Sequence, residues 1–283
     1  MNLLMKTKIK EFLLEDIGSG DVSAESIFSK DELSKGYFIA KSEGIFAGEN
    51  IPQFAYEAFG ENIHIQLNFH DGDWVKPGDV LLEVEGSVLA LLSCERVILN
   101  LMQRMSGIAT MTHNAIEKLN DPKMDVVDTR KTAPGLRVFD KKAVSVGGGK
   151  NHRFGLYDAV MLKDNHIAFS GGISKAVQSV RKRVGHMTPI EVEIETLSEL
   201  KEAILARPNV IMFDNLPPER VKEFSKLVPE TICIEVSGGI TLENIGDFRE
   251  CGGNVISLGW LTHSVQSFDI SFNKELKENK GKC

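Results

Sequence analysis

The sequence predicts an α/β protein, with an N-terminal α/β domain followed by an incomplete barrel of alternating strands and helices. Two observations lead to this fold class. Beyond residue 120, six short runs rich in β-branched and apolar residues recur at a spacing of roughly twenty residues, and helical patterns separate most of them. The first hundred residues lack this repeat. A chain of 283 residues is long enough to form both parts.

The N-terminal part begins with a predicted helix. Apolar residues at helical spacing indicate a helix over residues 3–17 that ends at Gly18. The turn-rich passage DGDWVKPGDVLLEVEG resembles biotinyl and lipoyl carrier folds, but no lysine sits in a tight central hairpin, so we favour a structural hairpin. A helical pattern returns over residues 87–118, with a predicted break at residues 105–107. Strand patterns lie between the helices at residues 36–48, 63–69 and 79–86.

The repeating part alternates strand and helix patterns. The strand runs are residues 124–128, 157–162, 189–194, 209–213, 231–236 and 254–258. The helical patterns between them include residues 173–184, 197–206, 218–228 and 241–251. A further predicted helix, residues 139–144, carries Lys141 and Lys142, which we expect on a solvated face. Because the carboxyl ends of barrel strands open onto one face, the polar residues that follow the strands are predicted to converge at one mouth.

The charge distribution excludes some partners and favours others. With a net charge of -7, a pI near 5.6, 42% hydrophobic residues and a mean hydropathy of -0.10, the chain resembles an ordinary globular protein. We therefore expect no nucleic-acid or membrane partner. Residues 128–166 nevertheless contain eight Lys or Arg against four Asp, a local charge of +4, so the remainder of the chain carries -11. Such a basic island suits a small polyanionic substrate.

Cysteine usage and the N-terminus predict a cytoplasmic protein. The N-terminus mixes lysines and acidic residues into its apolar positions, so it does not form a signal-peptide core. The longest apolar run is interrupted by Glu95 and Arg96 and is too short to span a bilayer. The four cysteines form no CxxC pair and no ligand spacing with histidine, which argues against a zinc site or disulfides: Cys94, Cys233, Cys251 and Cys283.

Candidate site residues lie mainly where strands end. Arg130, Lys131 and Lys163 follow strands, and His152 and Arg153 complete a cationic set that suits carboxylate or phosphate groups. The cluster Ser237, Gly238 and Gly239 precedes a predicted helix, and Gly259 follows the next strand. This arrangement resembles the phosphate sites of barrels, in which backbone N–H groups of late loops face the anion.

Carboxylates form a second candidate set. Strand alternation places Glu191, Glu193 and Glu195 on one face, and Asp214 ends the neighbouring strand. These groups could bind Mg²⁺ or sugar hydroxyls, and the alternative is a salt-bridge network inside the barrel. The sequence has no GxSxG, no P-loop and no GxGxxG after a strand, which argues against hydrolase, NTPase and dinucleotide-binding functions. Displacement at a phosphorylated sugar fits the residues best.

The residues 128–167, DTRKTAPGLRVFDKKAVSVGGGKNHRFGLYDAVMLKDNHI, are similar to the signature region of the quinolinate phosphoribosyltransferase family, also called carboxylating nicotinate-nucleotide pyrophosphorylases. The resemblance extends through residues 95–110, 191–200, 211–218, 235–245 and 257–271. It implies a pentosyltransferase that uses Mg²⁺ to convert quinolinate and phosphoribosyl pyrophosphate to nicotinate mononucleotide, pyrophosphate and CO₂ in de novo NAD biosynthesis. It also implies a homodimer, with a hexamer built as a trimer of dimers as a larger alternative.

The same resemblance implies an organisation and a set of roles. Residues 1–106 would form an α/β sandwich domain joined by a C-terminal strand within 266–283, and residues 107–265 an open β/α barrel of TIM type. Arg96 would reach the partner subunit's site. Lys131, Glu193 and Asp214 are implied as catalytic, and Glu193 and Asp214 as metal ligands. The implied substrate-binding residues are these three with Arg96, Thr129, Arg130, His152, Arg153, Lys163, Ser237, Gly238, Gly239, Gly259, Trp260, Leu261 and His263.

Two alternatives to this function remain at the level of sequence. A related pyrophosphorylase-like protein of molybdate-transport loci shares the fold and much of the cationic motif. A non-catalytic sensor or carrier of a sugar phosphate could use the same mouth. The complete cationic and acidic set argues against a degenerate binding protein. Turnover of quinolinate distinguishes a quinolinate phosphoribosyltransferase from the protein of molybdate-transport loci.

Overall fold

The computed structural model describes residues 1–275, and it divides the chain into two compact units. Unit 1 consists of Met1–Met111, Ala133–Gly148 and the residues from Ser264 onward, and unit 2 of Thr112–Thr132 and Gly149–His263. Residues 133–148, which fall inside the predicted barrel segment, group with unit 1. Among the described residues, no helix is long and apolar enough to cross a membrane. Cys94, Cys233 and Cys251 are free thiols, and Cys283 lies outside the described residues.

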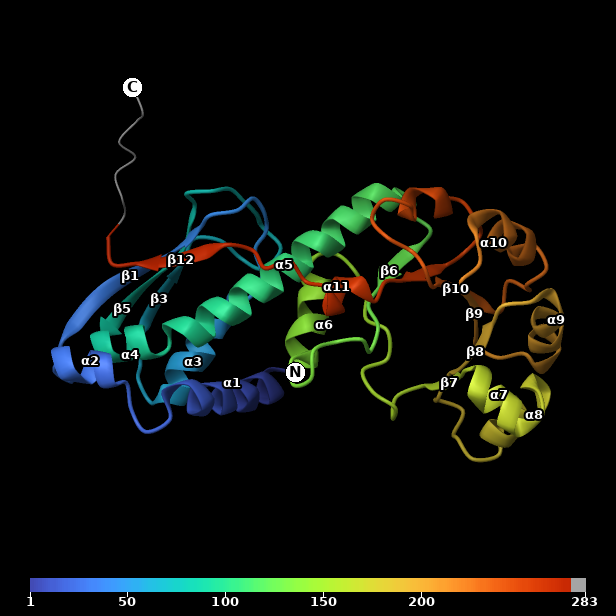
Figure 1. Cartoon of the computed structure of the whole chain (residues 1–283), viewed down its shortest axis with the longest axis horizontal. Coiled ribbons are helices and arrows are strands. Elements are labelled where there is room, and N and C mark those ends of the chain that lie inside the picture. The colour runs from blue at the N-terminus through green and yellow to red at the C-terminus, as the bar shows by residue number, and fades with distance from the viewer. Residues whose placement is uncertain (276–283) are drawn as a thin grey trace, which may run out of the picture. The chain divides into compact units, whose positions relative to one another are not determined.

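Unit 1 contains an antiparallel sheet whose strands come from both ends of the chain. Its order is β12 (Ile270–Asn273), β1 (Leu33–Ala40), β5 (Val80–Ser87) and β3 (His64–Leu67). A two-stranded sheet joins β2 (Gly44–Ile45) to β4 (Trp74–Val75). Figure 1 shows β12 beside β1, and the rings of Phe38 and Phe272 lie 4.8 Å apart between centroids. A strand of the predicted C-terminal segment, β12, thus pairs with β1, whereas residues 276–283 of that segment lie outside the described residues.

Helices cover this sheet with a continuous apolar core. They are α1 (Asn2–Ile17), α2 (Val22–Ile27), α3 (Ile51–Phe59), α4 (Val88–Ser93), α5 (Glu95–Leu119) and α6 (Arg137–Val146). The α1 helix ends at Gly18 as predicted, because Gly18 takes a φ of 57° that side-chain-bearing residues rarely adopt. The helices α2 and α3 were not predicted. Core side chains include Ile9, Phe38, Tyr56, Ile98 and Phe139.

The predicted helix break at residues 105–107 is wrong. The α5 helix runs without interruption from Glu95 to Leu119, and the chain instead divides α4 from α5 at Cys94. Gly107 has a packing role, because a Cβ at this position would collide with the carbonyl oxygen of Gln266. A glycine inside a helical pattern thus marks a close approach of backbone here.

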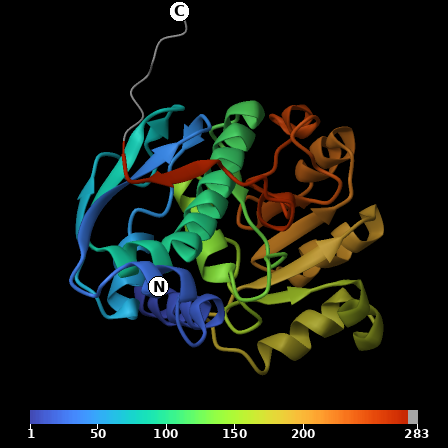
Figure 2. The same cartoon turned by 60° about the vertical axis from the view of Figure 1, so that its left-hand side comes forward.

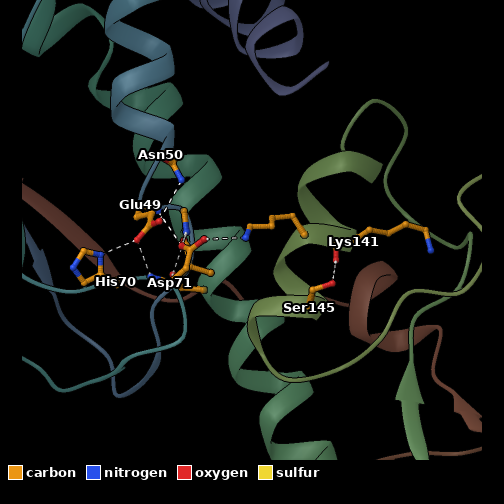
Figure 3. A network of polar contacts seen from close by, with 10 residues as sticks. Glu49, Asn50, His70, Asp71, Lys141 and Ser145 are labelled. Carbon is orange, nitrogen blue, oxygen red and sulfur yellow. Dashed lines mark hydrogen bonds and ion pairs between the residues drawn. The ribbon is translucent and has the colours of Figure 1, made fainter. Parts of the chain in front are cut away.

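The expectation of a solvated face for Lys141 is also wrong. Lys141 is fully buried, whereas the half-buried Lys142 next to it lies 3.5 Å from Asp71. Asp71 also accepts hydrogen bonds from the N–H groups of Gly48 and Glu49. Figure 3 shows this network and the Lys141 side chain extending away from it. Neighbouring lysines on one helix therefore have opposite environments.

Unit 2 is an open sheet of six parallel strands. The order is β6 (Asp125–Val127), β11 (Val255–Ser257), β10 (Cys233–Ser237), β9 (Val210–Asp214), β8 (Ile190–Ile194) and β7 (Val160–Leu162). Every neighbouring pair is parallel, and β6 and β7 form the two edges, which confirms an open β/α barrel. Four of the six predicted strand runs contain one of these strands, and β9 and β10 each extend one residue beyond their runs.

Helices alternate with the strands of unit 2. They are α7 (Asp164–Ser170), α8 (Ile173–Arg181), α9 (Leu197–Ala206), α10 (Pro218–Ser225) and α11 (Trp260–His263). Figures 1 and 2 show α8, α9 and α10 along the outer side of the strands. A capping box between Thr196 and Glu199 begins α9. The helix predicted over residues 241–251 is wrong, because only the 3₁₀ turn η1 (Ile245–Phe248) forms there.

Candidate active site

A cavity of about 350 Å³ opens at the carboxyl ends of the unit 2 strands. Eleven of the predicted site residues line it, which agrees with the expected convergence of strand ends. Its lining contains four cationic side chains, from Arg130, Lys131, Arg153 and Lys163. The other predicted residues in the lining are Thr129, His152, Glu193, Asp214, Ser237, Gly238 and Gly239.

Arg153 lines this cavity and has incomplete hydrogen bonding. Its Nη1 donates to the carbonyl oxygen of Ala159 at 2.8 Å, whereas its Nε is buried and has no hydrogen-bond partner among the described residues. Burial lowers the pKa of Arg153, and the nearby Arg130 guanidinium lowers it further. A buried donor without a partner is costly, so an acceptor arriving from a ligand would be stabilised there.

The acidic side of the cavity consists of Glu193 and Asp214. Lys163 Nζ donates to Glu193 Oε2 at 2.7 Å. Burial raises the pKa of Asp214, and the adjacent Glu193 carboxylate raises it further. Asn215 donates from Nδ2 to Asp214 Oδ2 at 2.7 Å and thereby orients that carboxylate. Two neighbouring carboxylates with oxygen ligands toward the cavity are a suitable donor set for Mg²⁺.

Glycines form the wall beside Asn215. Gly238 and Gly239 have φ values of 86° and 66°, in the left-handed region that favours glycine. A Cβ on Gly238 would also collide with the Asn215 side-chain oxygen. The backbone of Ser237 accepts the N–H of Asn215 at 2.9 Å, so the two loops are fixed to each other. The backbone therefore approaches the cavity closely, as expected for the predicted glycine cluster.

The base of the cavity holds His152 between acidic residues. The fully buried Asp128 accepts hydrogen bonds from the His152 N–H and the Asn151 amide, each at 2.8 Å. On the other side, His152 Nε2 lies 3.2 Å from Glu191 Oε2 and 3.4 Å from Glu235 Oε2. Both glutamates are nearly fully buried. The His152 ring is thus held by protein groups from several elements.

Five predicted residues are absent from the described lining of the cavity: Arg96, Gly259, Trp260, Leu261 and His263. Arg96 belongs to unit 1, where its side chain is 60% exposed and lies 3.6 Å from Glu95. Trp260 donates from Nε1 to the carbonyl of Ile240 at 2.9 Å. Leu261 is fully buried, backbone included.

Gly259 connects this last segment to the cavity residue Lys131. A Cβ on Gly259 would lie 3.0 Å from the Lys131 side chain and 3.3 Å from the His263 ring. The Thr262 hydroxyl donates to the Lys131 carbonyl at 2.9 Å. The segment after β11 therefore packs directly behind Lys131, and the absence of a side chain at Gly259 leaves room for it.

Five lining residues were not among the predicted site residues, namely Met161, Met212, Asn215, Glu235 and Ser257, although the sequence places Asn215 at a strand end beside Asp214. Four of them share one signal. Each stands two positions before a residue that was singled out at the end of its strand, as Glu235 does before Ser237. Since strand side chains alternate, a residue two positions earlier faces the same side. Asn215 follows Asp214 directly and carries a φ of 56°, which alternation does not predict.

The arrangement suits electrostatic catalysis on an anionic substrate. Cationic groups of Arg130, Lys131, Arg153 and Lys163 can bind carboxylates or phosphates, and two carboxylates can bind a cation or hydroxyl groups. No cysteine lies in the described lining. Groups of this kind stabilise a charged leaving group and do not require a covalent intermediate.

Comparison with known families agrees with this chemistry. Residues 21–106 match the quinolinate phosphoribosyl transferase N-terminal domain, and residues 108–273 match the C-terminal domain of the same family. A probable nicotinate-nucleotide pyrophosphorylase [carboxylating] of Bacillus subtilis is 52% identical over 275 residues, which cover 97% of this chain and 95% of the relative. A chloroplastic nicotinate-nucleotide pyrophosphorylase [carboxylating] of Arabidopsis thaliana is 40% identical, covering 94% of this chain and 82% of the relative.

Solved structures show the same fold. NadC from Streptococcus pyogenes superposes with a TM-score of 0.93 at 41% identity, over 96% of each chain. The nicotinate-nucleotide pyrophosphorylase from Francisella tularensis superposes with a TM-score of 0.90 at 34% identity, again over 96% of each chain. Both resemblances extend over nearly the full length of the chain.

Proposed function

Since this chain belongs to the quinolinate phosphoribosyltransferase family, we propose that its cavity binds quinolinate and phosphoribosyl pyrophosphate and catalyses their Mg²⁺-dependent reaction. The protein is a pentosyltransferase of the carboxylating nicotinate-nucleotide pyrophosphorylase type, an activity of de novo NAD biosynthesis. The observation that carries the assignment to this cavity is the convergence of four cationic side chains in one lining, from Arg130, Lys131, Arg153 and Lys163. A dicarboxylate supplies anionic groups that these cations can bind.

The reaction follows from the charges in the cavity. The ring nitrogen of quinolinate forms a bond to C1 of the ribose while the C1–O bond to pyrophosphate breaks. Lys131 stabilises the negative charge of the departing pyrophosphate. When the bond to the 2-carboxylate then breaks and CO₂ leaves, the electron pair stays on the ring carbon, where the adjacent positively charged nitrogen stabilises it until a proton adds to that carbon. Arg130, Arg153 and Lys163 hold the two carboxylates of the substrate.

Glu193 and Asp214 are the residues that would hold Mg²⁺. Their fit to the ion is supported by two adjacent carboxylates whose mutual repulsion raises the pKa of Asp214 beyond the effect of burial. When bound, Mg²⁺ supplies positive charge to the pyrophosphate group. The same carboxylates accept hydrogen bonds from ribose hydroxyls, and the backbone at Ser237–Gly239 with the Gly259 segment binds the 5-phosphate.

Turnover of the purified full-length chain tests this function. We expect stoichiometric CO₂, pyrophosphate and nicotinate mononucleotide from quinolinate, phosphoribosyl pyrophosphate and Mg²⁺, and loss of activity when the metal is chelated. Folded protein that releases no CO₂ from quinolinate would contradict the proposal and favour the molybdate-locus type of protein. Binding of phosphoribosyl pyrophosphate without any turnover would indicate a sensor.

Arg96 supports a homodimer with shared sites. Its side chain is 60% exposed on α5 and, among residues 1–275, forms an ion pair with the adjacent Glu95 alone, so it is available to a second subunit. If Arg96 completes the partner's site, Arg96→Ala and Lys163→Ala subunits are each inactive but regain activity when mixed, because one site of the mixed dimer contains both native residues. Activity that stays absent after confirmed subunit exchange would contradict sharing.

A further inference from the structure

Two buried glutamates beneath the cavity face a single histidine nitrogen. Glu191 is 5% exposed and Glu235 is 4% exposed, and their Oε2 atoms lie 3.2 Å and 3.4 Å from His152 Nε2. Their other oxygens, both Oε1, are buried without a hydrogen-bond partner among the described residues. Burying two carboxylates costs free energy, so this arrangement requires a compensating role for the pair.

The other ring nitrogen of His152 decides where its proton lies. Nδ1 accepts a hydrogen bond from the backbone N–H of Arg153 at 2.7 Å. An accepting nitrogen carries no hydrogen, so the ring proton is on Nε2, where it points to the two glutamates. The three side chains are close enough to hold a metal ion. A protonated Nε2 cannot ligate a metal, however, so the geometry favours a hydrogen-bonded cluster.

Two effects oppose each other in the charge of the ring. Burial lowers the pKa of His152, but its hydrogen bonds to Glu191 and Glu235 raise it more, to about 10, so these contacts by themselves favour a charged ring near neutral pH. A second ring proton would have to sit on Nδ1, directly against the Arg153 N–H. This backbone hydrogen bond therefore favours the neutral ring with its proton on Nε2. The two carboxylates accept a hydrogen bond from that Nε2–H and so keep the proton on Nε2.

The hydrogen bond at Nδ1 links the cluster to Arg153. Because Asp128 accepts the His152 N–H and Nδ1 accepts the Arg153 N–H, the backbone of both residues is fixed. The Nη1 of Arg153 is fixed by Ala159. The guanidinium edge that contains Nε then has one orientation, and planar recognition of a carboxylate depends on that orientation.

We infer that Glu191 and Glu235 are positioning residues: through the Nε2–H of His152 they keep Nδ1 as an acceptor for Arg153, and so hold the guanidinium of Arg153 in the cavity lining for a substrate carboxylate. This inference rests on the proposed function for the identity of the substrate. His152, which also lines the cavity, contributes by orienting Arg153.

Histidine NMR on the full-length protein tests the inference directly. In ¹⁵N-histidine-labelled protein, with the His152→Gln variant identifying the resonance, we expect one protonated nitrogen, Nε2, and one unprotonated nitrogen, Nδ1. Two protonated nitrogens, or a proton on Nδ1 alone, would overturn it. So would a divalent metal that survives dialysis in the wild type and is absent from the Glu235→Gln variant. This measurement stands even if quinolinate is not turned over, which would overturn the proposed function instead.

Kinetics of glutamine variants test the link to substrate binding. We expect Glu191→Gln with Glu235→Gln to raise the KM for quinolinate about tenfold, while the KM for phosphoribosyl pyrophosphate changes less than about twofold. The single variant Glu235→Gln should raise the KM for quinolinate by a smaller factor, and it replaces the double variant in this test if the double variant does not fold. Glu230→Gln removes the same charge from an exposed position and should leave both constants unchanged. Equal changes in both KM values, or a loss of thermal stability alone, would contradict a positioning role.

Discussion

The two units each bury charged side chains, but in opposite ways. In unit 1, the fully buried Asp140 carboxylate receives hydrogen bonds on both oxygens, from Arg104 Nε at 2.7 Å and Nη2 at 2.9 Å. In unit 2, buried polar atoms at the cavity have no hydrogen-bond partner among the described residues: Arg153 Nε, Glu191 Oε1, Glu235 Oε1 and Ser257 Oγ. For the described part of unit 1, one such atom is recorded, the Tyr56 hydroxyl.

This difference separates structural charges from charges available to a ligand. A buried ion pair whose donors and acceptors all have partners favours one packing arrangement, and it has no free donor or acceptor for a substrate. Buried polar groups that lack hydrogen-bond partners destabilise the ligand-free protein. Their burial becomes favourable when a ligand supplies the missing partners. Substitutions in unit 1 should therefore change stability, and substitutions at the cavity should change kinetics.

The largest effect is expected for Arg104→Ala. Removing the guanidinium leaves the Asp140 carboxylate buried and uncompensated, and burial already raises the pKa of Asp140 against the opposing effect of Arg104. The free energy of unfolding should fall by about 3–5 kcal/mol in urea titrations. The control Arg220→Ala removes an exposed pair with Glu223 and should cost less than about 1 kcal/mol. Equal losses from both variants would contradict the comparison.

Arg153→Ala should leave stability nearly unchanged and reduce activity strongly. The loss of a charged donor pair for a carboxylate lowers kcat/KM for quinolinate by about a hundredfold, which corresponds to about 2.7 kcal/mol. Arg153→Lys keeps the charge but not the planar donor edge, so it should recover only part of this loss. Full recovery by lysine would show that charge alone matters, against the role given to the Nε edge.

Much of unit 2 could be predicted from the sequence because its strands are buried on both faces and read as apolar, β-branched runs. Strand ends such as Asp214 and Ser237 were found because polar residues interrupt those runs. Glu235 was missed, since a single glutamate inside a strand reads as an ordinary exposed position. Glu235 is buried because the folded protein encloses that face of the strand, and the local sequence does not show this.

Other differences have physical causes beyond local pattern. Helical periodicity shows that Lys141 and Lys142 lie on different faces, but it does not show which face the rest of the chain covers. Gly107 indicated a break because glycine weakens a helix, yet its small size is needed for the approach of Gln266, which is distant in sequence. Tertiary packing decided both outcomes.

Lys131→Ala should slow the chemical step more than it weakens quinolinate binding. The Thr262 bond to the Lys131 carbonyl fixes its backbone, and the absence of a side chain at Gly259 leaves room for its side chain in the cavity lining. Its ammonium would stabilise pyrophosphate only as the charge develops. We expect kcat to fall about thirtyfold, or about 2 kcal/mol, with the KM for quinolinate within about threefold of the wild type. A raised quinolinate KM at unchanged kcat would contradict this role and place Lys131 with the carboxylate-binding groups.

The smallest effect is expected for Lys142→Ala. Its ion pair with Asp71 spans 3.5 Å at the surface of unit 1, and its side chain is 34% exposed, so water and salt screen it. Its removal should lower the free energy of unfolding by less than about 1 kcal/mol. The difference should vanish in 1 M salt, where the Debye length is only ~3 Å and charge interactions are strongly screened.

Lys141→Ala is the matched comparison, because its packed methylene groups are fully buried and their loss should cost about 2 kcal/mol or more at any salt concentration. Urea titrations at low and high salt separate the two. A salt-dependent loss at Lys141, or a large salt-independent loss at Lys142, would show that burial does not distinguish structural from surface charges in this unit.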